Sequence, residues 1–573
     1  MTANTAEQQG ARSWLSGGRF WLAYGVLAFM LLACRLSYDI TRPINGLHSW
    51  GFAHRCQFAR AHVRYGLGYT RGYWTWAVGD PPLAEPRHYL DHPPLSSIVN
   101  GGFMLALGIH DWTLRVARLL LSVIGLGIYL RLLRGLVDDV TAILAAALAV
   151  LVPITWYFGF GWYEVILGIL AIYCYLATIG ELDTPRRAWH LWGLGLALFF
   201  AIQMAWDGCF FAFAIGVHYV ARCVWRRRRP EWKLLIVISA VALVSTASVI
   251  WYLILGRGGN WQSLLEIVKW RTTALASRAA GEAFDWASWL KRVGVLLALN
   301  YRWPVLILAG LHILYHAGAR ISEVVARLAG KQPCSAPRRI PFFWLLLLPA
   351  ASQILVLKGA VWHHHYWFQA ATPLIALAAA LALRLVLDLV GKVCRGLAVG
   401  AVGLLLVICA VYCAGGASYY FSIVQHPASK IEMLQRLNRD IPPDKPLLSF
   451  WDFMLQDHAA KGAHYRPQVA WYLDREVVQA RSLEEIEAAA KSGRCNRYLI
   501  PAVRSLAPLI RAMAQRYRLA DRTEAVRPVP GIALDPSMPL NRGSVGYFVF
   551  DLTRPPDPTA WQRSRREPGG ASR

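Results

Sequence analysis

The 573-residue sequence lacks the cysteine patterns that mark disulfide-rich or zinc-binding proteins. Its 10 cysteines are scattered, most of them within apolar stretches, and none of them form a Cys-x-x-Cys pair. Neither a disulfide framework nor a zinc site is therefore supported. The sequence also lacks a glycine-rich phosphate loop of the dinucleotide-binding or P-loop kind, and it contains no internal repeat of fixed period.

Acidic residues are scarce beside basic ones, because 34 Asp and Glu against 60 Lys and Arg give a net charge of +26. Such a charge suggests a nucleic-acid partner, but its placement argues against one. Much of the basic charge lies in short links between hydrophobic segments: Arg131 and Arg134, Arg186 and Arg187, Arg226 to Arg229, Arg338 and Arg339, Lys392 and Arg395. This distribution follows the positive-inside rule, with contact to anionic lipids as a minor addition. The expected partners thus include membrane lipids and no nucleic acid.

Hydrophobic residues make up 56% of the chain, which includes 25 tryptophans. An ordinary soluble domain is less apolar, and several windows are long enough to cross a bilayer as helices. The chain is therefore expected to be a multi-pass membrane protein. Its first segment, Phe20–Tyr38, lacks the small-residue cleavage site of a signal peptide and is interpreted as a retained anchor.

Charge placement also predicts the topology. With Arg12 and Arg19 in the cytoplasm, the first outer loop, 39–95, lies on the opposite side of the membrane. The short segment Ser96–Ile109 is expected to be an interfacial or re-entrant helix, because crossing there would move every later basic link outside. Within the loop, Asn45–Ala77 is typical of an amphipathic helix on the membrane. The expected crossings, about eleven by length, are Phe20–Tyr38, Trp112–Leu130, Val140–Tyr157, Tyr163–Ile179, His190–Ala205, Cys209–Trp225, Leu234–Leu255, Val293–His316, Phe342–Leu357, Phe368–Leu387 and Leu397–Cys413.

The chain changes character near Ser418, where helix-like stretches begin to alternate with short apolar runs typical of strands. We expect a membrane module over 1–417, an extracytoplasmic α/β domain over 418–555 and a disordered tail over 556–573. The fold class is thus mainly α, a polytopic membrane protein with a C-terminal α/β domain. The stretches in question are Lys430–Arg439, Ser482–Ser492 and Leu506–Arg518 for helices, and Pro446–Trp451, Arg497–Ile500 and Gly546–Leu552 for strands.

The segment Tyr89-Leu90-Asp91-His92-Pro93-Pro94-Leu95 closes the first outer loop. Polar groups at a bilayer edge are costly unless they are used. Asp91 is suited to act as a general base or as a ligand that positions a metal or phosphate, with His92 beside it. The prolines restrict the residues before them to extended geometry. The same pattern also starts helices, because Pro favours the first turn and Asp the position before it.

The predicted topology places further polar residues on the same outer face: Glu164, Asp207, Arg271 and the run His363-His364-His365 followed by Tyr366. Arginine binds phosphate in a bidentate manner. Three consecutive histidines point in different directions on a helix, so they do not form a three-ligand metal site, but one or two suit a phosphate or sugar. Each residue also has a structural alternative: an aromatic-belt acid or histidine, a helix cap or a solvated helix face.

These features together resemble the GT-C superfamily of integral membrane glycosyltransferases, and most nearly the protein O-mannosyltransferases and the lipid A aminoarabinose transferase. Tyr89–Leu95 resembles the end of that family's first outer loop, an acid followed by His or Lys and then Pro-Pro-Leu. Pro153–Glu164 is similar to its second outer loop, His363–Pro373 to a later loop that contains His and Tyr, and Arg115–Arg118 to its Ala-Arg-Leu stretch. The resemblance covers about 400 N-terminal residues.

The resemblance implies a GT-C-like membrane module and an enzyme of the bacterial inner membrane with its C-terminal domain in the periplasm. Its expected activity is transfer of a hexose or pentose from a polyprenyl-phosphate donor to a glycan, lipid or protein acceptor, with inversion. Asp91 and Glu164 are the expected catalytic residues. The expected donor-binding residues are His92, Arg271, His363, His364, His365 and Tyr366. No cofactor is required by a pattern, and a divalent metal is left open.

The sequence departs from the family in one place. Many members carry an Asp early in the first outer loop, whereas the comparable stretch here, His48–Arg55, has no carboxylate. The base is therefore open among Asp91, His54 and Asp39, and Asp91 is favoured because, without the early Asp, it is the leading carboxylate of its loop.

Two other functions compete with glycosyl transfer. A transporter or flippase of a lipid-linked glycan would carry acids or broken helices near the midplane, often in paired halves. Here the polar residues cluster at one edge and no half-repeat is evident. A non-catalytic scaffold would leave Asp91 and Glu164 without a role.

Overall fold

The structure is a computed structural model that describes residues 17–38, 40–46, 48–80, 82, 86–160, 163–182, 186–273, 285–328, 343–423, 428–450, 467–523, 546–557 and 559. The chain divides into two compact units. Unit 1 consists of 1–40, 90–96 and 115–421, and unit 2 of 41–89, 97–114 and 422–573. The predicted change near Ser418 falls close to a boundary between the units, but residues 41–89 of the first outer loop, predicted with the membrane module, group with the C-terminal residues instead.

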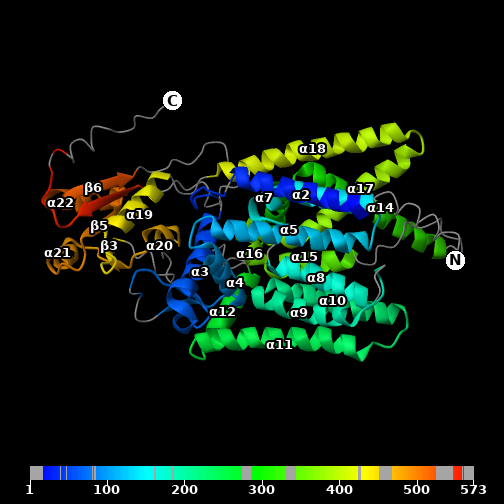
Figure 1. Ribbon diagram of the computed structural model, residues 1–573, viewed down its shortest axis with the longest axis horizontal. Coiled ribbons are helices and arrows are strands. Elements are labelled where there is room, and N and C mark those ends of the chain that lie inside the picture. The colour runs from blue at the N-terminus through cyan, green and yellow to red at the C-terminus, as the bar shows by residue number, and fades with distance from the viewer. Residues whose placement is uncertain are drawn as a thin grey trace. The chain divides into compact units, whose positions relative to one another are not determined.

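Unit 1 is a set of helices that lie side by side (Figure 1). Their apolar sequences match the predicted crossings closely, since α11 covers Trp232–Gly256 where Leu234–Leu255 was expected. The helices are α2 Gly17–Tyr38, α5 Thr113–Arg134, α6 Asp139–Leu151, α7 Pro153–Phe158, α8 Tyr163–Thr178, α9 Ala188–Met204, α10 Asp207–Trp225, α11, α12 Trp261–Thr273, α13 Trp286–Tyr301, α14 Trp303–Leu328, α15 Phe343–Val356, α16 Lys358–His363, η2 His365–Ala371, α17 Thr372–Gly391 and α18 Arg395–Ser422.

Two of the predicted helices are broken. Val140–Tyr157 divides into α6 and α7 at Pro153, and Val293–His316 divides into α13 and α14, whose axes are bent by 110°. Arg302 lies at the second break with a φ of 63°, just before Trp303 and Pro304. By length and composition, five described helices are long and apolar enough to cross a membrane, or six if the bent pair is one span. The expected eleven crossings therefore stay a prediction.

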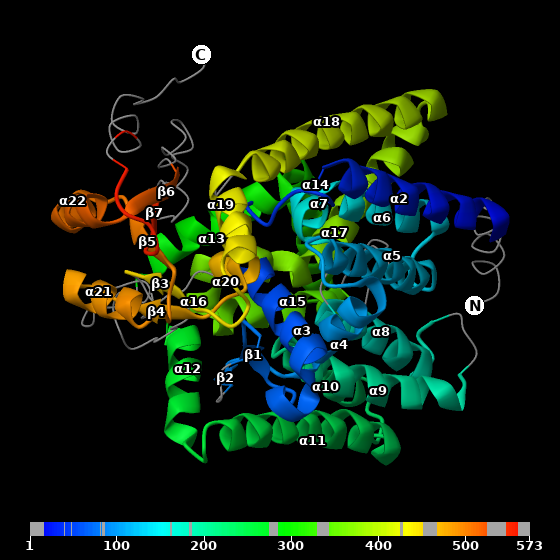
Figure 2. The same cartoon turned by 60° about the vertical axis from the view of Figure 1, so that its left-hand side comes forward.

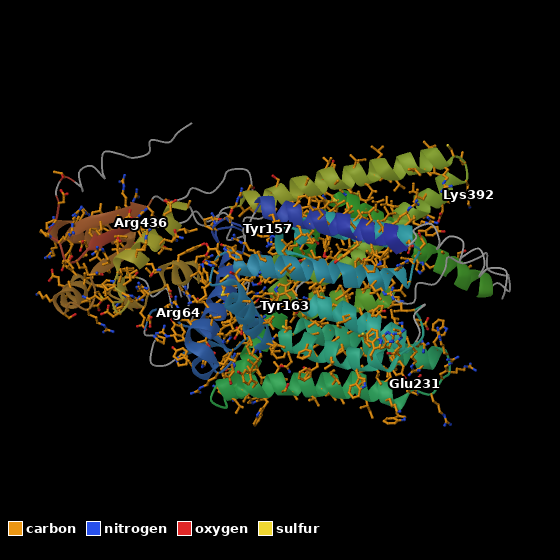
Figure 3. All side chains as sticks on the ribbon, in the orientation of Figure 1. Arg64, Tyr157, Tyr163, Glu231, Lys392 and Arg436 are labelled. Carbon is orange, nitrogen blue, oxygen red and sulfur yellow. The ribbon has the colours of Figure 1, made fainter. Side chains whose placement is uncertain are left out.

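The two ends of unit 1 differ in chemistry. One end holds the basic links, where Arg186 pairs with Glu231 at 2.7 Å and Arg222 pairs with Glu181 at 2.9 Å. Figure 3 shows Glu231 and Lys392 at this end, whereas Tyr157 and Tyr163 lie toward the other. Glu164 follows Tyr163 directly in α8. Basic links and the predicted acids thus occupy opposite ends, as the charge pattern indicated.

Unit 2 contains a five-stranded mixed sheet in the order β4-β3-β5-β7-β6. The three predicted strand runs form β3, β5 and β7, while β4 and β6 were not expected. β3 pairs in parallel with β4 and β5, and β7 is antiparallel to β5 and β6. The elements of this unit are α3 Ser49–Thr70, β1 Trp74–Trp76, β2 Arg87–Tyr89, α4 Leu95–Leu107, α19 Ala428–Asp440, β3 Leu447–Ser449, α20 Pro467–Leu473, β4 Val477–Gln479, α21 Leu483–Lys491, β5 Arg497–Pro501, η3 Arg504–Leu506, α22 Ala507–Arg516, β6 Arg518–Thr523 and β7 Tyr547–Asp551.

Alternating side chains of the sheet supply two hydrophobic cores. Leu447, Leu499 and Val549 pack with α19 and α20, and the intervening Tyr498 and Phe550 pack with α21 and α22. The helices accordingly cover both faces of the sheet (Figure 2). This arrangement follows from the period of two along a strand, where successive side chains point to opposite faces.

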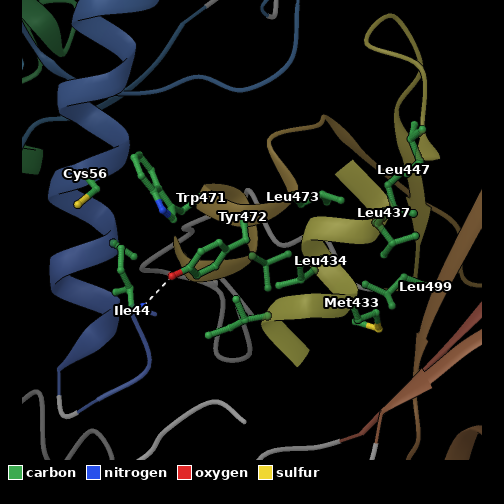
Figure 4. Packing of buried hydrophobic residues seen from close by; sticks show 14 of the residues in the cluster. Ile44, Cys56, Met433, Leu434, Leu437, Leu447, Trp471, Tyr472, Leu473 and Leu499 are labelled. Carbon is green, nitrogen blue, oxygen red and sulfur yellow. Dashed lines mark hydrogen bonds between the residues drawn. The ribbon is translucent and has the colours of Figure 1, made fainter. Parts of the chain in front are cut away.

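Helix α3 of the first outer loop packs against α20 within the same unit (Figure 4). The buried guanidinium of Arg60 donates to the carbonyls of Trp471 and Ala470 at 2.9 and 3.1 Å, and pairs with Asp474 at 3.2 Å. Burial lowers the pKa of Arg60, and the Asp474 carboxylate opposes that shift. These contacts make the first outer loop and the C-terminal sheet parts of one unit.

Candidate functional site

Asp91 is held in place by its main chain. The carbonyl of Asp91 accepts a hydrogen bond from the indole of Trp206 at 3.0 Å, and the carbonyl of Leu90 accepts one from Arg257 at 2.7 Å. Pro93 and Pro94 follow and lead into α4, so the segment also begins a helix, as its sequence allowed. Only 6% of Asp91 is exposed. The residue is therefore fixed at the joint of three segments and largely removed from solvent.

Two guanidinium groups approach the Asp91 carboxylate. Arg257 lies 3.1 Å from one oxygen and Arg271 lies 3.9 Å from the other. Both arginine side chains are mostly buried. Buried charges of this kind are stable only when they are paired. Since two cations face one carboxylate, the cluster carries one net positive charge.

His92 extends this cluster. Its Nε2 lies 3.2 Å from a terminal nitrogen of Arg271. Arginine has donors and no acceptor, so His92 accepts this hydrogen bond through Nε2 and carries its ring proton on Nδ1. A neutral imidazole next to Arg271 leaves the net charge of the cluster unchanged. The structure thus brings together the predicted residues Asp91, His92 and Arg271.

Arg257 was not predicted from the sequence. It ends α11 and precedes Gly258 and Gly259, whose φ angles of 63° and 85° need glycine. The turn leads into α12, whose Leu264 packs on Val249 of α11 and whose last turn carries Arg271. One signal would have found Arg257: it is a basic residue at the helix end opposite to the basic links.

Glu164 lies in the first turn of α8 and is 3% exposed. An acid in the first turn is favoured by the helix dipole, which explains its local stability. Glu164 lies at the same end of unit 1 as Asp91. Trp206, which contacts Asp91, immediately precedes α10, and α10 packs alongside α8. The catalytic role of Glu164 stays a prediction.

The consecutive histidines His363, His364 and His365 have different surroundings. His365 is 1% exposed, and its ring meets Tyr420 edge-on at 5.9 Å within the helical core. The ring of His364 stacks on Tyr366 at 5.0 Å. The side chain of His363 lies outside the described residues, but its helix α16 packs against α12, which carries Arg271. The structure therefore places α16 beside the cluster and directs His365 away from solvent.

The alternative bases differ from Asp91. Asp39 lies outside the described residues. His54, in α3 of unit 2, is 4% exposed and accepts a hydrogen bond at Nε2 from the indole of Trp76 at 2.7 Å. A tryptophan indole is a donor only, so the basic lone pair of neutral His54 is already engaged. Which of these residues acts as the base stays a prediction.

Comparison with known proteins identifies the fold. No protein-family model matches the chain, and no curated protein does. The solved structure of apo ArnT from Cupriavidus metallidurans matches with 14% identity and a TM-score of 0.55, covering 94% of this chain and 98% of that one. ArnT bound to undecaprenyl phosphate matches with 14% identity and a TM-score of 0.54, covering 93% and 98%. The apo oligosaccharyltransferase of Archaeoglobus fulgidus matches with 12% identity and a TM-score of 0.53, covering 85% and 70%.

ArnT, the lipid A aminoarabinose transferase, and the archaeal oligosaccharyltransferase are both GT-C enzymes. The likeness extends over nearly the whole of ArnT, including the parts assigned here to both units. The chain is therefore a multi-pass membrane protein with the GT-C fold.

Proposed function

We propose that this protein transfers a sugar from a polyprenyl-phosphate donor to an acceptor hydroxyl at the outer face of the bacterial inner membrane. The observation that carries this proposal is the buried cluster of Asp91 with Arg257, Arg271 and His92. It combines a carboxylate suited to accept a proton with fixed cations suited to hold a phosphate. The GT-C fold, shared with a structure that contains undecaprenyl phosphate, supports the same chemistry.

The charge of the cluster suits a monophosphate donor. A sugar phosphodiester carries one negative charge, which matches the net positive charge of Arg257, Arg271 and Asp91 together. When Asp91 takes a proton the cluster gains a second positive charge, while the departing phosphate monoester gains a second negative one. Fixed groups that match charge as it develops stabilise the transition state.

The proposed reaction is a single displacement. The acceptor oxygen attacks the anomeric carbon, Asp91 takes the hydroxyl proton, and the bond between that carbon and the phosphate oxygen breaks. The configuration at the anomeric carbon inverts, and polyprenyl phosphate leaves on the face opposite the attacking oxygen. His92 supports Arg271 by accepting its hydrogen bond. Glu164 is the proposed second acid and orients the acceptor or the donor sugar.

The proposed reaction is written with the chain's own cations, and a divalent metal is left open. Among the residues that the structure describes, no three His, Cys, Asp or Glu side chains gather as metal ligands. The two arginines already supply the positive charge that a metal ion would bring to the phosphate. We therefore assign phosphate binding to the chain's own cations.

Transfer of a radiolabelled sugar from polyprenyl phosphate, with the purified protein in liposomes, tests the proposal. Asp91→Asn and Glu164→Gln are expected to lower the rate at least about 100-fold, in the range found for general bases. Asp388→Asn is the matched control, because Asp388 pairs with Arg384 in the last turns of α17, away from the cluster. Wild-type rates in both site variants, with normal folding, would overturn the proposal. Mass spectrometry of envelope glycans with and without the protein would identify the sugar and acceptor.

A further inference from the structure

Helices α8 and α10 run parallel in a constant register. A Cβ added at Gly168 would lie 2.5 Å from the ring of Phe211. About two and three turns further along, the hydroxyl of Tyr175 meets Nδ1 of His218 at 2.8 Å, and Arg222 donates to the carbonyl of Ile179 at 3.2 Å. In each pair the second residue follows the first by the same interval along the chain. The two helices therefore keep one face toward each other over their whole length.

This register places Glu164 opposite Asp207. Glu164 lies four residues before Gly168, and Asp207 lies four residues before Phe211. Four residues are about one helical turn, so each acid lies on the same face of its helix as the residue in contact. Both carboxyl groups are buried, with 3% and 7% of the residues exposed. Two buried acids that face each other influence each other strongly, because an interior of low dielectric constant screens them poorly.

The residues on either side of Asp207 make two other contacts. Trp206 donates its indole N–H to the carbonyl of Asp91 at 3.0 Å. Gly208 lies against the end of α9, where an added Cβ would come within 2.3 Å of the backbone of Ala201. No side chain fits there, so the turn from α9 into α10 is held in direct backbone contact and has little freedom to move.

We propose that the corner formed by Trp206, Asp207 and Gly208 is a positioning element that fixes the two acids of the site relative to each other. Trp206 holds the main chain of Asp91, the register of the two helices sets Asp207 level with Glu164, and Gly208 anchors the corner to α9. A rigid turn between two reacting groups is what accurate placement in a catalytic site requires. The catalytic part of this inference rests on the proposed function, whereas the contact between Asp207 and Glu164 does not.

The contact between the two acids is tested without any assay of transfer. Thermal unfolding of the full-length protein in detergent is measured for Asp207→Asn, Glu164→Gln and the double variant. The Tm changes of the single variants are expected to miss the sum by more than about 2 °C, since side chains in contact are not additive. Gln203→Leu is the control, because Gln203 bonds to Ser245 and Ser248 of α11 instead. If the Tm change of the double variant equals the sum of the Tm changes of Asp207→Asn and Glu164→Gln, the proposed contact is overturned.

The positioning of Asp91 is tested by Trp206→Phe, which keeps an aromatic ring and removes the N–H donor. The expected result is a fall in kcat of about 10-fold with KM for the donor nearly unchanged, since a misplaced base slows chemistry without weakening binding. Gln203→Leu should leave both constants near wild type. An unchanged kcat in Trp206→Phe would overturn the positioning role, even if Asp91→Asn proves that the proposed function is right.

Discussion

Arg257 holds a central position among the site residues, because it binds both the main chain and the side chain of the Asp91 segment. Its guanidinium donates to the carbonyl of Leu90 and lies 3.1 Å from the Asp91 carboxylate. A donor phosphate entering the cluster would compete with that carboxylate for the same N–H groups. Under the proposed function, Arg257 would exchange the Asp91 carboxylate for the donor phosphate as the donor binds.

Replacement of Arg257 by lysine should therefore test whether the geometry of its N–H donors matters in addition to its charge. A lysine keeps the positive charge but offers no planar fork of donors. We expect Arg257→Lys to lower kcat/KM for the donor at least about 10-fold, and Arg257→Gln to lower it further. Steady-state transfer kinetics measure both. Equal activity of the lysine variant and the wild type would show that only the charge at this position matters.

His62, in α3, should make the stability of the folded protein depend on pH. Its ring nitrogens bond to Thr70 at 2.8 Å and to Ser97 at 2.9 Å, and burial lowers its pKa to about 4. An unfolded chain takes up the proton near pH 6.5. As the pH falls from 6.5 toward 4, the unfolded state binds a proton that the folded state does not, so stability is lost, by at most about 3 kcal/mol.

Thermal unfolding in detergent between pH 7.5 and 5 measures this effect. His62→Gln keeps hydrogen-bonding capacity without titrating, so the Tm of that variant should fall less on acidification than that of the wild type. His88, whose pKa burial also lowers to about 4, leaves a residual dependence of the same sign. Identical pH dependence in variant and wild type would refute the assignment to His62.

At the scale of elements, the contact between α3 and α20 depends on one buried ion pair. Asp474→Asn would leave the buried Arg60 guanidinium without its counter-charge, at a cost of about 3 kcal/mol. Arg64→Gln removes a second partner of Asp474 whose side chain is 34% exposed, and should cost less than about 1 kcal/mol. Chemical denaturation of the full chain compares the two. A larger loss in the Arg64 variant would contradict this ranking.

The elements show which parts of the fold the sequence could predict. Long apolar helices such as α11 were predicted within two residues at each end, because composition alone distinguishes them. The single helix over Val293–His316 was wrong, since Arg302 takes a positive φ and breaks it. Pro304 could have signalled the break, because residues before proline avoid the helical region. β4 is only three residues long and β6 is largely polar, so hydrophobicity did not reveal either strand.

The site was predictable only as far as the end of the helical unit at which it lies. The charge pattern placed Asp91, Glu164 and Arg271 at one end of the helices, and the structure agrees. It could not predict that Arg257 would meet Asp91, because that contact joins residues 166 positions apart. It also could not separate His364 from His365, whose environments depend on where α16 ends and η2 begins.

At the scale of the whole molecule, the charge asymmetry between the two ends of unit 1 predicts the orientation in the membrane. At one end of unit 1, Glu231 and Glu181 form ion pairs with arginines. This end should face the cytoplasm, because short basic links are retained there. The end with Asp91 should face the periplasm, where the proposed function requires the donor and the acceptor to meet. A donor site on the cytoplasmic side would be incompatible with the proposed function.

Reporter fusions decide the orientation. A reporter active only in the periplasm should be active when fused after Tyr420, near the end of α18, and silent when fused after Arg229, between α10 and α11. A reporter active only in the cytoplasm should give the opposite pattern, which controls for unstable fusions. Because one miscounted crossing reverses every later loop, the two sites together test the parity of the whole chain. Cytoplasmic activity after Tyr420 would place the C-terminal residues inside and refute the predicted topology.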